Sequence, residues 1–356
     1  MINLQEYGYK GTLTPDEQNL IPARITAIHR ERSAAICEHG EIHCQLSGRF
    51  SMNIKQRSDL PAVGDFAMIR YNPHGDSMIE RILPRTTQFS RLDNLGSHAS
   101  KYEIASFEQV VAANFDYVFI TTSLNQDFKA NRIARYLTEA YNSGATPVVI
   151  LTKSDLCDDL DEYIFKAESA APGVPIIALS AHTGSGIDAL SPYIAPGKTI
   201  VFLGMSGVGK SSLLNALTGE TTMKVNAIRE DDARGRHTTT HRELFKLPSG
   251  ALVIDTPGMR ELGLWDADEG LAAAFSDIEA LYAECRFSDC SHEKEPGCAV
   301  QRALQDGTLD PKRYEQYLTQ KRELAYNQDR LAYRQAKTDK FRQINKMMRS
   351  RPNPKK

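Results

Sequence analysis

The clearest chemical signal in the sequence is a glycine-rich segment of the form Gly-x-x-x-x-Gly-Lys-Ser. It follows the apolar run 199–203 and precedes a helix-favouring run, which is the context that a phosphate-binding loop requires. Its glycines let backbone N–H groups turn toward phosphates, and the following helix N-terminus adds a positive dipole. We expect Lys210 to reach the β- and γ-phosphates and to stabilise charge there during catalysis, and Ser211 to ligate Mg2+. The residues predicted to surround the phosphates are Gly204, Met205, Ser206, Gly207, Val208, Gly209, Lys210, Ser211 and Ser212.

A second motif, upstream of the phosphate loop, indicates which base is bound. The apolar run 147–151 ends in Thr152, Lys153, Ser154 and Asp155, which resembles the [NT]-K-x-D motif of GTPases. In that motif the aspartate accepts hydrogen bonds from guanine N1–H and the exocyclic amine, and the lysine packs across the ring. Adenine does not offer that pair of donors. Taken alone, the four residues would also fit an exposed loop.

The next strand-like run also ends in a recognisable polar motif. Ser180, Ala181 and His182 follow the run 174–179 and resemble the S-A-x motif, which contacts guanine O6 through its backbone. Ligands of open α/β sheets bind at the carboxyl ends of the strands. Two base motifs on successive strand ends therefore predict a guanine nucleotide.

Downstream of the phosphate loop, two segments could hold Mg2+ and sense the γ-phosphate. Asp255 to Gly258 follows an apolar strand and resembles the D-x-x-G motif, in which the aspartate holds Mg2+ through water. Between this motif and the phosphate loop, 235–240 reads GRHTTT and suits a first switch segment. By spacing we assign the Mg2+ ligand to Thr239, with Thr238 as the second choice. A threonine-rich surface loop is the alternative.

The order of these motifs is unusual. Ras-like GTPases read phosphate loop, switch I, D-x-x-G, base motif and then S-A-x, whereas this chain places both base motifs first. Either order can assemble one site, because neighbouring strand ends converge wherever the chain is cut. The permuted order also makes the segment after Asp255 run directly into the C-terminal region, so hydrolysis could move that region.

A cluster of cysteines and a histidine predicts a separate metal site. Cys285, Cys290, His292 and Cys298 lie within 14 residues, which is sufficient for a closed tetrahedral Zn2+ site with a structural role. Free buried cysteines beside an unrelated histidine are the alternative, but close cysteine spacing in a cytosolic chain favours a metal. We interpret Asp289 and Glu293 as solvated neighbours of this cluster.

The elements that position these motifs fall into three regions. Short β-branched runs between about 22 and 84, separated by turn residues, predict a small antiparallel barrel such as an OB-fold, although an ordinary β-subdomain without a ligand is equally consistent. From about residue 114, apolar strands alternate with amphipathic helices, and after about 271 the chain is mostly helical. We therefore expect a multidomain α/β protein with a β-barrel at 1–90, a circularly permuted P-loop GTPase domain at 100–270, and a helical zinc-binding domain with a basic tail at 271–356.

Composition limits the class of protein. The chain has 356 residues with a net charge of −2, but 312–356 contains 14 Lys/Arg and four Asp/Glu, a net of about +10. That tail resembles an amphipathic basic helix suited to RNA phosphates, although a solvated helical face is the generic alternative. Because no apolar run approaches the ~20 residues that span a bilayer and the N-terminus lacks a secretory pattern, we expect a cytoplasmic protein without a membrane partner.

The combination of GMSGVGKSSL, GRHTTT, DTPGMRE and the downstream Cys/His cluster resembles the ribosome small subunit-dependent GTPase A family over nearly the whole chain. The resemblance implies an N-terminal OB-fold, a permuted GTPase domain and a C-terminal zinc domain. It further implies a role in late maturation of the small (30S) ribosomal subunit, with hydrolysis stimulated by that subunit and binding to rRNA. Thr152 stands where many members have asparagine, a tolerated variant.

Catalysis is expected to differ from that of Ras. The position after D-x-x-G, which would hold a water-orienting glutamine, is Met259, whose side chain does not orient water by hydrogen bonding. His237 is our candidate for that role, as the family resemblance also suggests, although an imidazole that only shapes the loop fits equally well. Gly207 occupies the position where potassium-activated GTPases have asparagine, so we predict no potassium dependence.

The leading hypothesis is thus a Mg2+-dependent GTP hydrolase that acts on the small ribosomal subunit. We expect this protein to be a monomer. A nucleotide-gated RNA-binding factor with incidental hydrolysis is the alternative, which Met259 and the missing glutamine make plausible. A P-loop kinase for a small molecule is disfavoured by the paired base motifs.

Overall fold

The computed structural model describes residues 1–11, 19–29, 32–92, 108–125, 128–219, 243–255 and 267–329. The chain divides into two compact units, Met1–Leu262 and Gly263–Lys356. Within the described residues, none of the helices combines the length and the apolar character needed to cross a membrane.

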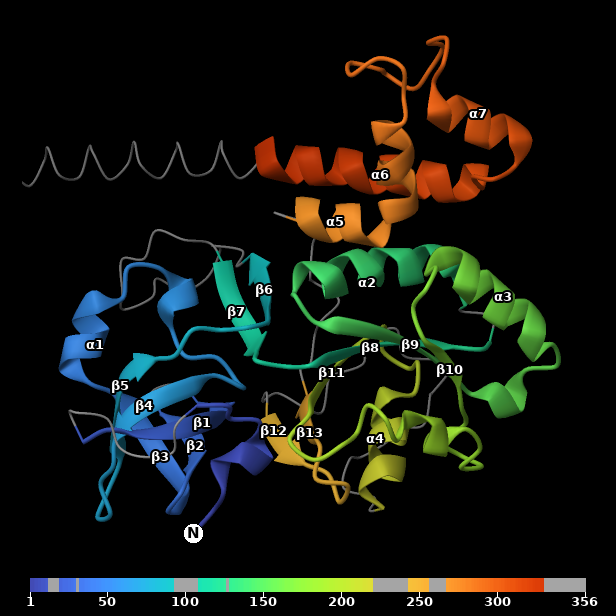
Figure 1. Cartoon of the computed structure of the whole chain (residues 1–356). Coiled ribbons are helices and arrows are strands. Elements are labelled where there is room, and N and C mark those ends of the chain that lie inside the picture. Colours follow the sequence, from blue (N-terminus) through green and yellow to red (C-terminus); the bar gives the residue numbers. More distant parts are fainter. Residues whose placement is uncertain are drawn as a thin grey trace, which may run out of the picture. The chain divides into compact units, whose positions relative to one another are not determined.

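The N-terminal part of the first unit is a closed β-barrel (Figure 1). Its strands lie in the order β1-β2-β3-β5-β4, and β4 also pairs with β1, which closes the barrel. All neighbours are antiparallel except β3 and β5, which are parallel. This is the order of a five-stranded OB-type barrel, so the expected barrel is confirmed. Its strands are β1 (Ile21–Ile28), β2 (Ser33–Cys37), β3 (Gly40–Leu46), β4 (Phe66–Arg70) and β5 (Ser77–Ile82).

The barrel is filled by alternate side chains from each strand. Its buried core consists of small and branched apolar residues, in keeping with the interior of a small barrel. A short helix, α1 (Gly48–Asn53), follows β3, and the Ser47 hydroxyl caps it by accepting from the Phe50 N–H at 3.1 Å. The 3-10 helices η1 (Leu4–Tyr7) and η2 (Arg57–Asp59) lie before β1 and β4 in the chain. The core residues are Ile21, Ala23, Ile25, Ala35, Cys37, Cys44, Ala67, Ile69 and Ile79.

The second part of this unit is a mostly parallel sheet. Its strands lie in the order β10-β9-β8-β11-β13-β12, and all neighbours are parallel except β12, which is antiparallel to β13. The first five strands therefore end at the same edge of the sheet. These strands are β8 (Tyr117–Ser123), β9 (Thr146–Thr152), β10 (Ile176–Ala178), β11 (Thr199–Leu203), β12 (Glu243–Lys246) and β13 (Leu252–Asp255).

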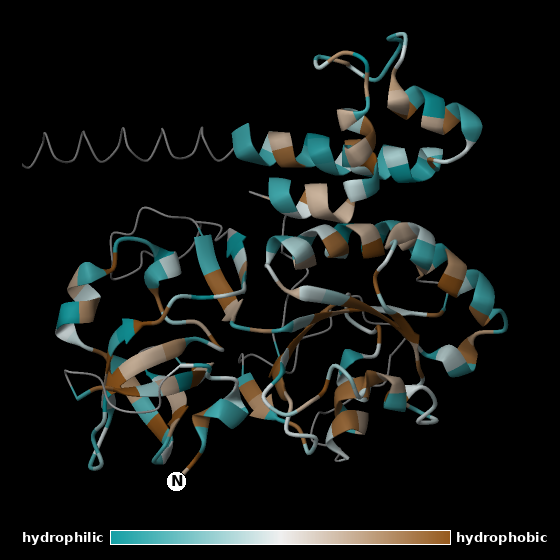
Figure 2. Ribbon diagram, viewed as in Figure 1, coloured by the Kyte–Doolittle hydropathy of each residue, from teal (hydrophilic) through white to brown (hydrophobic). Residues whose placement is uncertain are grey.

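Helices cover both faces of this sheet. In Figure 1, α2 (Ala130–Asn142) and α3 (Leu160–Ala170) lie on one face, and α4 (Lys210–Thr218) lies on the other. Figure 2 shows hydrophobic residues concentrated on the strands and mixed with hydrophilic ones on α2 and α3, as amphipathic helices require. The short helices η3 (Ser154–Leu156) and η4 (Ile187–Leu190) follow β9 and β10. The alternation of strands and helices expected from residue 114 onward is thus confirmed.

Two features of the fold were not expected from the sequence. First, β12 pairs with β1 of the barrel, so the barrel and the mostly parallel sheet form one 11-stranded sheet. Second, β6 (Gln88–Leu92) and β7 (Glu108–Ala113) form a separate antiparallel pair between the two parts.

The second unit is helical in the part that the structure describes. Its helices are α5 (Asp268–Ala274), α6 (Ser276–Ala283), α7 (Ala299–Asp306) and residues 311–329. Arg313 holds the last helix against the first two, because its guanidinium donates to both Asp277 carboxylate oxygens at 2.7 Å and to the Ala274 carbonyl at 3.0 Å. The Tyr317 hydroxyl donates to Glu279 at 2.6 Å. Residues 330–356, which hold most of the predicted basic tail, lie outside the described residues.

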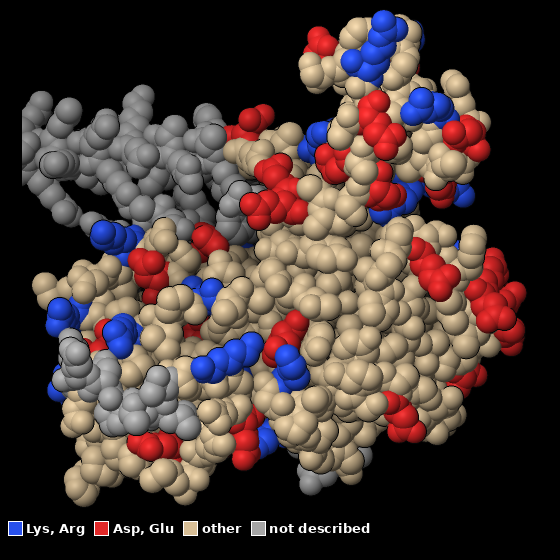
Figure 3. Space-filling view, viewed as in Figure 1, with Lys and Arg blue, Asp and Glu red and all other residues tan. Residues whose placement is uncertain are grey.

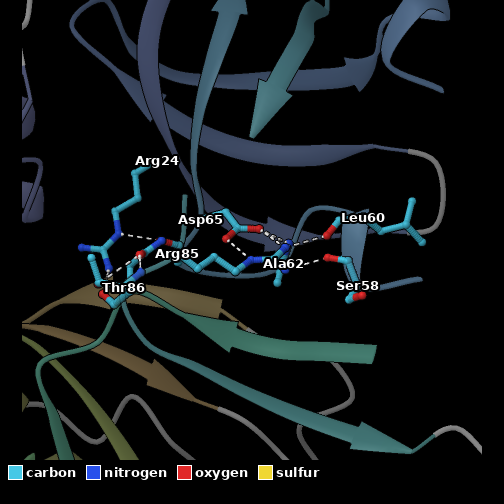
Figure 4. A network of polar contacts seen from close by, with 9 residues as sticks. Arg24, Ser58, Leu60, Ala62, Asp65, Arg85 and Thr86 are labelled. Carbon is cyan, nitrogen blue, oxygen red and sulfur yellow. Dashed lines mark hydrogen bonds and ion pairs between the residues drawn. The ribbon is translucent and has the colours of Figure 1, made fainter. Parts of the chain in front are cut away.

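A buried ion pair fastens the loop before β4 to the segment that leaves the barrel (Figure 4). Arg85 donates from Nε and Nη2 to the two Asp65 carboxylate oxygens at 2.8 and 2.7 Å, and it also donates to the Ser58 and Leu60 carbonyls. Asp65 additionally accepts from the Ala62 N–H at 2.7 Å. Burial raises the pKa of Asp65, and the Arg85 guanidinium opposes that shift. Nearly every polar atom of the pair thus has a partner.

We predict that Asp65→Ala lowers the free energy of unfolding by about 3 kcal/mol, because it leaves the Arg85 guanidinium buried without its counter-charge. Arg32→Ala is the matched control, since Arg32 pairs with Asp76 at 2.9 Å but is 60% exposed, and its loss should cost at most about 1 kcal/mol. Urea unfolding of the full chain, followed by circular dichroism, measures both. Equal losses in the two variants would contradict this prediction.

Candidate functional site

The glycine-rich loop begins where β11 ends, beside the neighbouring strand β8. Gly204 has φ +152°, and a Cβ atom placed on it would lie 2.4 Å from the Thr121 carbonyl oxygen. Only glycine allows such an approach of the two backbones. Gly209 has φ +98° and forms the N-cap of α4, which starts at Lys210. The loop therefore has the strand, glycine turn and helix N-terminus that a phosphate site needs.

The loop side chains are arranged around this turn. Val208 is buried, Ser206 and Ser211 are exposed, and Ser212 is partly buried in the first turn of α4. The Lys210 Nζ lies over the loop and donates to the carbonyl oxygens of Gly204 and Met205 at 2.5 and 2.6 Å. These contacts keep the ammonium group at the mouth of the loop, where it is available to phosphate oxygens.

The predicted base motif lies against the phosphate loop. The Thr152 hydroxyl, at the end of β9, contacts the Val208 carbonyl and also lies 3.2 Å from the Thr122 carbonyl. Lys153 is in the left-handed conformation with φ 59°, and its Nζ donates to the Gly207 carbonyl at 3.0 Å. Two residues of the base motif thus bind two carbonyls of the phosphate loop, which joins the two halves of the predicted site.

The remaining base residues lie on the adjacent turns. Ser154 donates its N–H to the Leu179 carbonyl at 3.2 Å, which links η3 to the end of β10, and Asp155 is exposed on η3. Ser180 is buried, and its hydroxyl accepts from the His182 and Thr183 N–H groups at 3.2 Å each. These bonds fix the turn that contains Ala181, whose backbone is the predicted contact for the base.

Asp255 is the last residue of β13, next to β11 in the sheet. Burial raises the pKa of its carboxyl, the Lys210 ammonium lowers it, and the Glu243 carboxylate raises it. The net effect is a pKa above the usual range of an aspartate, with desolvation as the largest cause. The other predicted residues of the switch segments, His237, Thr238, Thr239, Gly258 and Met259, lie outside the described residues.

The second unit brings its predicted metal ligands together. The ligand atoms of Cys285, Cys290, His292 and Cys298 all lie within 4.8 Å of one another. The Cys285 and Cys298 sulfurs are 4.0 Å apart, and they lie 3.4 and 3.7 Å from His292 Nδ1. Tetrahedral Zn2+ with usual bond lengths requires ligand separations of about 3.5 to 3.8 Å. The cluster is compatible with zinc.

Neighbouring residues hold these ligands in place. The Tyr282 ring stacks on the His292 ring with centroids 3.7 Å apart, and the Gln301 side chain donates to the His292 carbonyl at 2.7 Å. The Gln301 N–H donates to the Cys298 sulfur at 3.4 Å, so this cysteine also caps α7. Such outer contacts are typical of a metal site. Asp289 and Glu293 are exposed, and neither belongs to the four-residue group.

Comparison with known proteins agrees with this geometry. Residues 82–265 match the family model described as RsgA GTPase. The chain is 43% identical over 353 residues to "Small ribosomal subunit biogenesis GTPase RsgA 1" of Listeria innocua, covering 98% of this chain and 97% of the relative. It is 43% identical to the protein named "Small ribosomal subunit biogenesis GTPase RsgA" of Opitutus terrae, covering 94% and 92%.

The chain belongs to the RsgA GTPase family. It is therefore a GTPase, and the resemblance inferred from its motifs is confirmed. The crystal structure of YjeQ from Thermotoga maritima superposes with a TM-score of 0.62 at 27% identity, covering 85% of this chain and 98% of that one. The structure of YloQ, described as a circularly permuted GTPase, superposes with a TM-score of 0.61 at 25% identity, covering 85% and 94%. The permuted order of this RsgA-family chain is thus shared with a solved structure.

The structure adds residues that the sequence did not single out. Thr121 and Thr122, at the end of β8, place their carbonyl oxygens against Gly204 and Thr152. The sequence could have indicated these two residues, because β8 ends in the polar run TTS, just as the neighbouring strands end in polar motifs. The contact of Thr152 with the phosphate loop had no such signal, since the two segments are 56 residues apart.

We predict that Thr152→Val weakens GDP binding about 3- to 10-fold, because it removes one hydroxyl contact to the phosphate loop and leaves the Val208 carbonyl unpaired. Thr152→Asn should bind normally, since an amide donates to the same carbonyl. Thr146→Val, at the exposed start of the same strand, is the control. Titration of a fluorescent GDP analogue measures all three, and unchanged binding by Thr152→Val would show that the contact does not matter.

Proposed function

We propose that this protein hydrolyses GTP with Mg2+ at the site formed by the ends of β8, β9, β10, β11 and β13. We further propose that it binds the small (30S) ribosomal subunit and its rRNA, assists late maturation of the subunit, and hydrolyses GTP faster when bound there. The observation that carries the proposal is the pair of hydrogen bonds from Thr152 and Lys153 to the phosphate loop. The curated relatives are named for biogenesis of the small ribosomal subunit.

Guanine specificity is assigned to the base motifs. The exposed Asp155 carboxylate accepts from the two guanine donors, Lys153 covers the ring, and the backbone at Ala181 contacts O6. Ser154 and Ser180 hold these turns in place through their hydrogen bonds to neighbouring loops. The phosphates are held by the N–H groups from Met205 to Ser212, and Lys210 exchanges its carbonyl contacts for the β- and γ-phosphates.

Mg2+ would be held by Ser211 and Thr239 directly, and by Asp255 through water. The exposed Ser211 hydroxyl at the start of α4 and the carboxylate of Asp255 beside Lys210 fit this cation. When bound, Mg2+ neutralises charge that develops on the phosphates. Gly258 is assigned to the γ-phosphate, and His237 remains our candidate for orienting the attacking water. Lys210 stabilises the transition-state charge.

The cysteine and histidine cluster of the second unit is assigned one structural Zn2+. Its four ligands leave no open position for chemistry, so the ion would supply folding free energy to the loop between α6 and α7.

The basic residues of 312–356 are assigned to rRNA. The α3 side of the first unit is less suitable, because acidic side chains gather over that helix in Figure 3. That helix has Asp159 at its N-cap and Asp161 and Glu162 in its first turn. We propose a cytoplasmic, monomeric protein.

Turnover measured with and without purified small ribosomal subunits tests the proposed function. We expect the small subunit to raise the GTP hydrolysis rate at least about tenfold, as activating partners do for other GTPases, and large subunits to leave it unchanged. Lys210→Ala should abolish turnover under every condition.

Two outcomes would contradict this proposal. Equal rates with small, large and no subunits would leave a GTPase with another target. Normal turnover by Lys210→Ala would remove the phosphate loop from the reaction.

We predict that the wild-type protein contains one zinc ion and that purified Cys290→Ala retains less than about half of it, because the three remaining ligands leave one tetrahedral position open and bind the ion more weakly. The helical unit of this variant should also unfold at a lower temperature. Metal analysis and thermal unfolding measure these changes. Cys157→Ala, which lies outside the cluster, should keep its zinc, and equal zinc contents in the two variants would refute the assignment.

A further inference from the structure

Strand β1 changes its neighbour part-way along its length. Its first residues, Ile21 to Arg24, pair with β4 and close the barrel, whereas Ala27 pairs with Glu243 of β12 in the nucleotide-binding sheet. The register of β1 on β2 shifts between Ile25 and Ala27, which marks a bulge at the point of change. A bulge bends a strand and increases its twist. At this point β1 exchanges β4 for β12 on one side, while on its other side it stays paired with β2 of the barrel.

The part of β1 that pairs with β12 lies in register with Asp255, a residue of the proposed nucleotide site. Glu243 is opposite Ala27 on one side and opposite Asp255 on the other. A single lateral row thus runs across three strands, from the last residue of β13 to the barrel. Without β1, β12 would be the edge strand of the sheet, and its unpaired backbone groups would be free to pair elsewhere.

Near the middle of β1, Arg24 is completely buried. Figure 4 shows its side chain and some of its contacts. Its Nε donates to the Gly64 carbonyl at 3.3 Å, Nη1 to the Thr199 hydroxyl at 3.0 Å and to the Tyr7 carbonyl, and Nη2 to the Asn114 carbonyl at 2.8 Å. Its guanidinium also lies over the Phe66 ring, 4.8 Å from the centroid.

These contacts make Arg24 an anchor between the two parts. Thr199 is the first residue of β11, which leads to the phosphate loop, and Gly64 lies in the barrel. Burial lowers the pKa of Arg24 to about 9, and the Asp116 and Asp65 carboxylates oppose the shift. The group is therefore still a cation at neutral pH, with its donors satisfied.

The Arg24 side chain and the β12 pairing hold two different parts of β1. Arg24 makes four hydrogen bonds in different directions, whereas among the described residues the pairing of β1 with β12 has one register pair, Ala27 with Glu243. The row from Asp255 through Glu243 to Ala27 is a backbone route, within the described residues, by which a displacement of β13 would reach β1, with Arg24 as the fixed point.

We propose that the β12–β1 junction transmits the state of the nucleotide site to the barrel. The inference rests on the guanine-nucleotide binding proposed above. When GTP and Mg2+ hold the Asp255 end of the row, β12 is fixed and its pairing with β1 is strengthened. When GDP is bound, the pairing opens more often and the barrel is less tightly held to the sheet.

Hydrogen exchange of the full chain tests this proposal. We expect amides of residues 25–28 to exchange at least about fivefold more slowly with a non-hydrolysable GTP analogue and Mg2+ than with GDP, because local opening governs exchange. Residues 77–82, in β5 on the barrel and away from the junction, should exchange equally in both states. Binding of each nucleotide is first verified by fluorescence titration.

A reversible cross-link provides the second measurement. In the double variant Ala27→Cys and Glu243→Cys, a disulfide is formed by oxidation and identified by mass spectrometry. The oxidised variant should exchange its amides at the same rate with either nucleotide, and reduction should restore the difference in exchange rate. The matched control is Ala34→Cys with His43→Cys, which joins the paired positions of β2 and β3 within the barrel. This control should keep the nucleotide-dependent difference in exchange rate whether it is oxidised or reduced.

The outcomes separate the two proposals. If both nucleotides bind and residues 25–28 exchange equally in the two states, the coupling is wrong and the proposed function stands. If the wild-type protein binds neither nucleotide, the proposed function fails and the coupling fails with it. Should the cross-linked variant not fold, the wild-type exchange comparison alone decides.

Discussion

The proposed nucleotide site depends on the close passage of β11 beside β8 at the carboxyl edge of the parallel sheet. The Thr121 carbonyl occupies the space that a Cβ atom at position 204 would need. With glycine there, the chain stays close to β8 as it turns into the proposed phosphate loop. The same edge brings Thr152 and Lys153 within hydrogen-bonding reach of the loop. Every other assignment of the site follows from this convergence of strand ends, which main-chain hydrogen bonds fix.

This convergence explains why the permuted order is tolerated. The strands meet through lateral pairing, so the site does not require the phosphate loop to precede the base motifs. The permutation instead changes what is attached to the sheet. The chain reaches β8 from the barrel, and β12 lies against β1 of that barrel. The barrel is thus joined to the nucleotide-binding sheet by backbone pairing and by the buried Arg24.

Local patterns in the sequence predicted much of this structure. The apolar runs predicted β8, β9, β10, β11 and β13, and the glycine spacing predicted the turn between β11 and α4. The cysteine spacing predicted the group of three cysteines and one histidine that could hold a metal ion. Each of these features is specified by residues within about 20 positions of one another.

What could not be predicted depends on contacts between distant residues. Arg24 lies in the alternating run ARITAI, where a charged residue would ordinarily face solvent, and its burial follows from acceptors at Tyr7, Thr199 and Asn114. The short strand β12 has only four residues and no strong periodicity, and it is held by strands on both sides. The pairing of β6 with β7 likewise joins segments separated by 93–107, which lie outside the described residues.

The central claim is that five strand ends form one guanine-nucleotide site, and competition binding tests it most directly. A fluorescent GDP analogue bound to the full chain would be displaced by GTP, ATP or xanthosine triphosphate, using the wild-type protein and Asp155→Asn. The account predicts that wild type prefers GTP over ATP by at least about a thousandfold, and that Asp155→Asn prefers xanthosine triphosphate, since the amide donates to the additional carbonyl. Equal displacement by ATP and GTP, or unchanged base preference in Asp155→Asn, would contradict it.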